Sequence, residues 1–205
     1  NIDKGRTDRF LGNMYVEARP IEGLTLRVNA GLDRANISRK TYEPKSTLYG
    51  RNLQGNGDIY TNDNNQYLLE ATATYAKTIK EQHKVNLLAG TSYEQFNVEG
   101  VNSGNNNFLL DGFLYNNLNA GTGTKRVGSS FSKNKMESYF FRVNYIFKDR
   151  YYLTGTFRAD GASVFAKNHK WGYFPSAALG WTFSEEPFMK SLSSWLTMGK
   201  MRLSW

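Results

Sequence analysis

Apolar and polar side chains alternate with a period of two residues along several stretches of this chain. In YYLTGTFRADG, residues 151–161, Leu153 and Phe157 fall on one face of an extended strand, while Thr154 and Arg158 fall on the other. This alternation is typical of a β-strand whose two faces meet different surroundings. The sequence predicts eight strands of about 9 to 11 residues. They lie near residues 10–19, 24–33, 67–76, 84–94, 137–147, 151–160, 175–183 and 198–205.

The connections between these strands alternate between short and long. Short turns with the sequences PIEG, KTIKEQH and KDR predict antiparallel hairpins. Polar stretches at about 34–65 and 95–135 are too long for ordinary connections, and we expect them to be long loops. A medium loop is expected at 161–174, and the segment SEEPFMKSLSSW allows a turn of helix before the last strand.

An outer-membrane β-barrel has this combination of alternating strands, short turns at one end and long loops at the other. Each strand would present one face to lipid and the other to a watery lumen. Aromatic residues lie near the short turns, where an interfacial girdle would need them: Tyr75, Tyr145, Phe147, Tyr151, Trp181 and Phe183. A soluble β-sandwich of the lectin or adhesin kind also alternates. Phe140 and Ile146, on the predicted polar face, leave that alternative open.

Composition agrees with an all-β chain but does not choose between these alternatives. Aromatic residues make up 15% of the sequence and mean hydropathy is −0.59, and no apolar run is long enough for a membrane-spanning helix. The chain has no cysteine, which excludes disulfides and thiolate metal sites. Its net charge of +8 permits an anionic partner.

The sequence contains no recognisable catalytic, cofactor or metal site, and we predict that the chain is not an enzyme. His83 and His169 lack ligand-spaced partners, so we interpret both as solvated loop histidines. Asp58 and Asp63 lie in an Asn-rich stretch, but it lacks the glycine and final glutamate of a calcium loop, which favours a hydrated surface loop. Nucleic acid is not expected, because the strand aromatics lie mostly opposite the Arg and Lys residues.

Residues 135–205 contain a series of motifs in a fixed order. They are SYFFRVNY, the KDR turn, RADGASVF, WGYFPS, GW, SEE and LTMGKMRLSW. Together they resemble the barrel of SusC/RagA-type TonB-dependent transporters of Bacteroidetes. Ala162 and Val164 stand where that family usually has Ser and Arg, and Met198, Gly199 and Met201 also depart from its pattern. The resemblance is looser over residues 10–94.

The resemblance implies an antiparallel transmembrane β-barrel segment, with about eight strands of a plugged barrel of roughly 22 strands. It implies import of a glycan or an oligopeptide across the bacterial outer membrane, with a SusD-like surface lipoprotein as the lid and TonB as the energy source. Residues 1–205 would be part of the barrel domain, without the plug domain or a signal peptide. Since the sequence begins without Met and ends within a predicted strand, we expect an internal piece of a longer chain.

Individual residues receive roles from their position in the pattern. Trp171 and Tyr173 are candidates for contact with substrate or with the loop base, and Arg158 and Asp160 are candidates for a substrate pair or for structural partners on the lumen wall. Basic loops are expected to lie near anionic lipopolysaccharide or a lipoprotein. Residues predicted to face lipid are Val143, Leu153, Phe157, Leu179 and Trp181.

Overall fold

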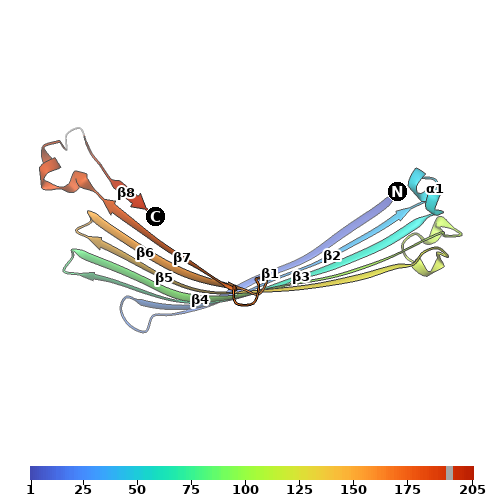
Figure 1. Ribbon diagram of the computed structural model, residues 1–205, viewed down its shortest axis with the longest axis horizontal. Coiled ribbons are helices and arrows are strands. Elements are labelled where there is room, and N and C mark those ends of the chain that lie inside the picture. The colour runs from blue at the N-terminus through green and yellow to red at the C-terminus, as the bar shows by residue number, and fades with distance from the viewer. Residues whose placement is uncertain (193–195) are drawn as a thin grey trace. The chain divides into compact units, whose positions relative to one another are not determined.

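The computed structural model describes residues 1–192 and 196–205. It contains one eight-stranded sheet in which the strands follow one another in chain order (Figure 1). The strands are β1 (Ile2–Ala18), β2 (Leu24–Glu43), β3 (Asn56–Ile79), β4 (His83–Asn106), β5 (Arg126–Phe147), β6 (Tyr151–Ala162), β7 (Trp171–Trp181) and β8 (Met201–Ser204). The helical segments are α1 (Leu48–Leu53), η1 (Asp111–Phe113), η2 (Leu118–Ala120), η3 (Phe183–Glu185) and η4 (Pro187–Leu192).

The predicted all-β fold with eight strands is confirmed, but the predicted strand lengths are wrong for the first five strands. These are 17 to 24 residues long. The two polar stretches that we expected to be long loops are mostly strand, because β2 and β4 continue into them and β3 and β5 begin in them. Only residues 44–55 and 107–125 connect these strands.

Polar side chains on neighbouring strands explain why those stretches are extended. The Arg9 guanidinium on β1 donates to Asp33 on β2, with 2.8 Å between Nε and Oδ1. Arg39 on β2 pairs with Asp3 on β1. Cross-strand pairs of this kind support sheet pairing without apolar burial. The hydrophobic alternation disappears here although the backbone stays extended.

By internal contacts the chain divides into two compact units, each formed from several strands. Unit 1 comprises residues 1–12, 31–67 and 95–134, and unit 2 comprises residues 13–30, 68–94 and 135–205. Unit 1 contains the buried aromatic cluster of Tyr42, Phe108 and Tyr115. The Tyr42 hydroxyl donates to the Asp111 carboxylate at 2.8 Å, which satisfies its polar end inside this cluster.

Unit 2 contains the short turns, and these are where the sequence predicted them. Lys80 and Glu81 have positive φ, as do Lys148 and Asp149, which is the backbone of tight two-residue hairpin turns. Gly23 ends the first turn with φ of 81°, and a side chain there would collide with the carbonyl oxygen of Ala76. Glycine is therefore required at this turn.

The alternative β-sandwich is wrong for the part of the chain that the structure describes, because a single sheet is present and no second sheet packs on it. The predicted medium loop is shorter than expected, since β7 begins at Trp171. The predicted last strand is reduced to four residues. The expected helical turn is present as η3 and η4, and its last residues, 193–195, lie outside the described part.

Candidate functional site

One face of the sheet in unit 2 is almost entirely apolar. The register of β5, β6 and β7 places Phe147 beside Tyr151 and Tyr151 beside Trp181, which forms a row across the sheet. Every second residue along the strands forms a further row of the same kind. Members of this apolar face are widely exposed; Leu179, for example, is 55% accessible. The rows are Phe147–Tyr151–Trp181–Met201, Tyr145–Leu153–Leu179–Leu203, Val143–Gly155–Ala177, Phe141–Phe157–Pro175, Tyr139–Ala159–Tyr173 and Glu137–Gly161–Trp171.

Aromatic rings gather at both ends of this apolar face. At the end with the short turns, Phe147 stacks with Tyr151 at a centroid distance of 6.1 Å, and the His83 ring lies 4.8 Å from Phe147. At the other end, the Tyr139 ring stacks with Trp171 at 5.8 Å. Ten residues separate Trp171 from Trp181 along β7, which is about 33 Å of strand. Tilted by about 45°, this length matches the apolar band of a membrane barrel, about 25 Å tall.

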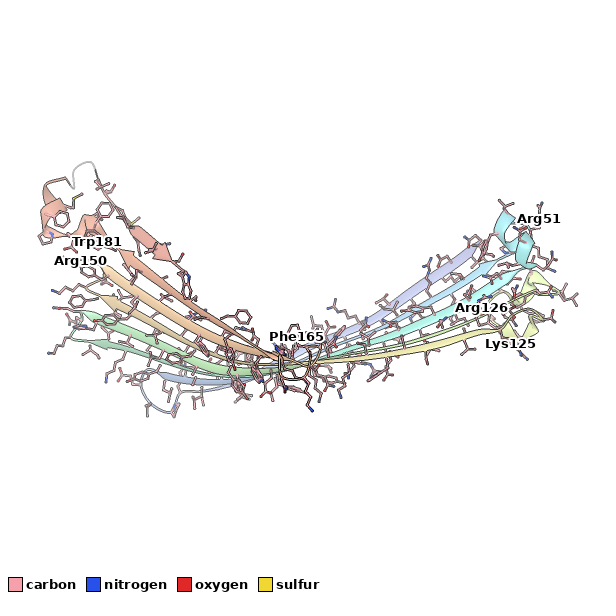
Figure 2. All side chains as sticks on the ribbon, in the orientation of Figure 1. Arg51, Lys125, Arg126, Arg150, Phe165 and Trp181 are labelled. Atoms are coloured by element: carbon pink, nitrogen blue, oxygen red, sulfur yellow. The ribbon has the colours of Figure 1, made fainter. Side chains whose placement is uncertain are left out.

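Glu186 fixes the ring row beside the short turns. Its carboxylate accepts hydrogen bonds from the Tyr151 hydroxyl at 2.5 Å and from Trp181 Nε1 at 3.1 Å, and Arg150 lies 3.4 Å away. Figure 2 shows Arg150 and Trp181 at this end of the sheet. The side chain of Glu186 is only 9% exposed. These donors, Tyr151 first, lower the pKa of Glu186, so its carboxylate stays charged while nearly buried.

The opposite face of unit 2 is polar. Arg158 donates to Asp160 at 2.8 Å and to the buried Ser138 hydroxyl at 3.3 Å. Phe140, which broke the predicted alternation, lies over Gly90, where an added side chain would collide with its ring. The aromatic ring therefore occupies space that glycine leaves free on the polar face.

The predicted substrate candidates do not form one site. Trp171 and Tyr173 belong to the apolar face together with Leu179 and Trp181, because all four have the same parity on β7. Arg158 and Asp160 lie on the other face as an ion pair. Residue parity along β6, which contains Arg158 and Asp160, and along β7 was the signal in the sequence that separates the two pairs.

Unit 1 contains a hollow with polar and apolar lining residues that the sequence analysis missed. Its volume is about 320 Å³, and its lining includes the ion pair of Arg9 and Asp33, the amides of Asn64 and Gln66, and the Phe96 ring. These residues come from four successive strands, so no single sequence motif predicts the hollow. A charge-balanced pair, two amides and one ring suit a neutral polar ligand that also has an apolar surface.

The remaining candidate residues have structural partners. The interpretation of His83 as a solvated loop residue is wrong, since it begins β4, is half-buried, and its Nδ1 lies 2.7 Å from the Tyr145 hydroxyl. Asp58 and Asp63 lie on β3 rather than on a surface loop. Asp58 pairs with Arg126 at 2.7 Å, and Asp63 accepts from Asn36. Within residues 1–192 and 196–205, no cluster of three metal-ligating side chains occurs.

A large apolar hollow also lies on the apolar face. Its volume is about 750 Å³, and Leu153, Leu179, Trp181 and Leu203 are among its lining residues. Within the described residues, none of the helices combines the length and the apolar character that a membrane crossing requires.

Comparisons with known proteins find relatives that match the whole of this chain. No family model matches the chain. The chain is 31% identical over 205 residues to the TonB-dependent receptor P3 of Formosa agariphila, and 31% identical over 210 residues to the TonB-dependent receptor SusC of Bacteroides thetaiotaomicron. The matches cover 100% and 99% of this chain. Along its whole length the chain is similar to the SusC-type family of TonB-dependent receptors.

The fold agrees with this family. The RagAB peptide importer in its closed-closed state superposes with a TM-score of 0.85 at 21% identity, over 98% of this chain and 22% of that one. The sheet thus matches part of the barrel of a SusC/RagA-type receptor. The chain spans about one fifth of the length of the curated relatives it matches, 20% for both P3 and SusC.

Proposed function

We propose that residues 1–205 are part of the barrel domain of an outer-membrane importer, which takes up a nutrient with energy from TonB and with a SusD-like surface lipoprotein. The exposed apolar face of unit 2 carries this proposal. This face is a contiguous apolar surface of several rows with aromatic rings at both ends, and the opposite face of the sheet is polar. Such an apolar surface is unfavourable in water and favourable in a bilayer. We assign transport rather than catalysis, and place the protein in the bacterial outer membrane.

The lipid-facing assignment of Val143, Leu153, Phe157, Leu179 and Trp181 follows from this proposal. Arg158 and Asp160 would then stand on the lumen wall, where their ion pair and the bond to Ser138 suit a structural role. Trp171 and Tyr173 would face the outer part of the membrane rather than the cargo. The plug and the TonB-contacting segment would lie elsewhere in the longer protein.

The test uses the full-length protein in its own bacterium. Outer membranes are isolated and extracted in mild detergent, and the native mass of the assembly containing this chain is measured. We expect an assembly several times heavier than 23.4 kDa that includes a lipoprotein. Deleting TonB is expected to abolish growth on the cargo while leaving the protein in the membrane. A water-soluble species of about the mass of the chain would contradict the proposal.

The cargo is a glycan or an oligopeptide, and the hollow around Arg9 and Phe96 in unit 1 is the candidate contact. Its Phe96 ring can pack against the apolar side of a sugar or of an amino-acid side chain. Growth of a strain that lacks only the gene for this receptor, on single glycans and on single peptides, separates the two classes. Phe96→Ala in the full-length protein should then reduce uptake of the cargo identified in this way.

The matched control for this variant is Phe131→Ala. Gly100 of β4 lies beside Ser130 of β5, so even-numbered residues of the two strands share a face and Phe131 lies on the other one. Both rings are exposed in unit 1. Equal effects of the two substitutions would contradict a role of the hollow in cargo contact.

A further inference from the structure

The loop between β6 and β7, residues 163–170, is held firmly although it is exposed. The Ser163 amide donates to the Lys135 carbonyl at 2.9 Å, and the Lys135 amide donates to the Ser163 hydroxyl at 2.8 Å. The Ala162 amide donates to the Lys170 carbonyl at 2.9 Å. The first two bonds fasten the base of the loop to β5, and the third joins the two ends of the loop to each other. The loop therefore presents its side chains from a fixed position.

This loop exposes apolar and cationic side chains together. Val164 is 62% exposed and Phe165 is 57% exposed. The sequence SVFAKNHK contains two lysines and a histidine and no acidic residue. Figure 2 shows Phe165 on this loop. Exposing the Val and Phe side chains to water costs about 25 cal/mol per Å² of apolar surface. Apolar and cationic side chains together therefore suit a partner surface that has apolar and anionic groups side by side.

A hollow of about 340 Å³ adjoins the loop at the end of the apolar face. Lys135 and Lys170 contribute to its lining beside the rings of Tyr93 and Trp171. The carboxylate in this lining, Glu137, accepts a hydrogen bond from the Tyr139 hydroxyl at 2.5 Å. The lining residues of the hollow therefore include two lysines against one glutamate, which gives them a positive net charge.

We propose that the hollow and the loop 163–170 together bind the phosphate-bearing headgroup of an anionic outer-leaflet lipid. The Lys135 and Lys170 ammonium groups bind its phosphate, Trp171 packs against its glycosidic or glycerol backbone, and Val164 and Phe165 enter the upper acyl region. This inference rests on the proposed membrane location of the apolar face.

Three observations favour a lipid over a protein partner. The hollow is continuous with the apolar face through the Glu137–Gly161–Trp171 row. It lies ten residues of β7 from the other ring row, which is the separation expected for the two membrane interfaces. Lysines beside interfacial rings place their stems along apolar surface and their charges at headgroup level.

The test is native mass spectrometry of the full-length protein in detergent, titrated with diphosphoryl lipid A and, separately, with phosphatidylcholine and inorganic phosphate. The double variant Lys135→Gln/Lys170→Gln should bind lipid A about 30-fold more weakly, because each lysine near an anionic surface contributes about fivefold. The matched control Arg51→Gln/Lys125→Gln removes two exposed cations from unit 1, labelled in Figure 2, and should leave lipid A binding unchanged.

Each outcome decides the proposal. Unchanged lipid A binding in the double variant, or an equal loss in the control, overturns it. So does a double variant that keeps lipid A and loses a co-purified lipoprotein instead, since the surface then belongs to a protein interface. Tight binding of inorganic phosphate without lipid A would indicate a small-anion site and overturns it too. Absence of the protein from outer membranes would instead contradict the proposed function.

A second measurement tests the depth of the loop. A polarity-sensitive fluorescent probe is attached to the cysteine of the Phe165→Cys variant. The probe should report an apolar environment when the protein is in vesicles that contain lipid A. It should report an aqueous environment when the protein is kept in solution by an amphipathic polymer without detergent or lipid. Val127→Cys provides the control, since Val127 lies on β5 in unit 1 and is 83% exposed. Identical probe spectra at the two positions in vesicles would overturn insertion of the loop.

Discussion

Units 1 and 2 use the same antiparallel sheet to produce opposite surfaces. In unit 1 the strand surfaces carry ion pairs such as Arg9–Asp33 and Arg39–Asp3, and apolar burial is confined to a small cluster around Phe108. In unit 2 one face carries row after row of exposed apolar and aromatic side chains. The same backbone pairing therefore supports both a polar and an apolar surface, and the side-chain pattern alone makes the difference.

The largest expected effect is a loss of stability in the buried cluster of unit 1, which should leave unit 2 unchanged. Phe108 is 1% exposed, and Phe108→Ala should destabilise this cluster by about 3–5 kcal/mol through lost burial and the cavity left behind. Limited proteolysis of the full-length protein in membranes should show faster cleavage within residues 107–125. Assembly in the membrane should be retained, because unit 2 contains none of these contacts. Loss of assembly would mean that the two units do not behave separately.

The next effect concerns the apolar face of unit 2. Val143 lies in a middle row between the two ring rows, so Val143→Lys should cost about 2–4 kcal/mol near the bilayer midplane. The folded fraction of the full-length protein in outer membranes, read from heat-modifiable gel mobility, should fall. Ser176→Lys is the control, because Ser176 is exposed on the polar face, opposite Thr156. If both variants assemble equally well, the assignment of the faces is wrong.

A smaller effect is expected from acid at the turn end of unit 2. The hydrogen bonds from Tyr151 and Trp181 lower the pKa of Glu186, so the folded form holds this proton less tightly than the unfolded form. The resulting stabilisation is complete above the ordinary carboxyl pKa of about 4.5 and is lost as pH falls through the lower pKa of the folded form.

Near-ultraviolet circular dichroism of the detergent-solubilised protein, recorded from pH 7 to pH 3, measures this loss. Glu186→Gln should reduce the aromatic signal at neutral pH and remove the part of the pH dependence that Glu186 causes. A wild-type and a variant titration that superpose would show that the carboxylate does not hold the ring row.

The smallest effect belongs to the ion pairs of unit 1. Arg9 is largely exposed, so water screens its pair with Asp33 and the pair should contribute little to the free energy of unfolding. A double-mutant cycle of Arg9→Gln and Asp33→Asn, in urea at low and high salt, should give a coupling that salt weakens. A coupling as large as the Val143→Lys effect would remove the contrast between the polar and the apolar unit.

Hydrophobic alternation predicted unit 2 well and unit 1 poorly, for a physical reason. Around Leu153 and Leu179 successive residues point to an apolar and to a polar face of the sheet, so the pattern repeats every two residues. Around Arg39 and Asp58 the side chains on the strands are polar, and the pattern disappears although the strands continue. Their extension depends on partners far away in sequence, such as Asp3 for Arg39 and Arg126 for Asp58.

The candidate site was predictable only in part, because some of its residues meet only through contacts between strands that are far apart in the sequence. The residues that we propose to face lipid follow from parity within single strands, and parity also places Trp171 and Tyr173 beside them. The hollow around Arg9 and Phe96 needs four strands in register, and the hollow around Lys135 and Lys170 needs the base of a loop to be fastened to another strand. Neither arrangement is visible in a local motif.

The strict chain order of the strands has a consequence for how such a sheet grows. Each strand is paired with its neighbour in sequence, so a hairpin brings its own partner with it. Adding or removing one hairpin changes the width of the sheet by two strands and leaves the register of every other pair intact. Duplication of a gene segment that encodes one hairpin is therefore a simple evolutionary route between receptors of different circumference.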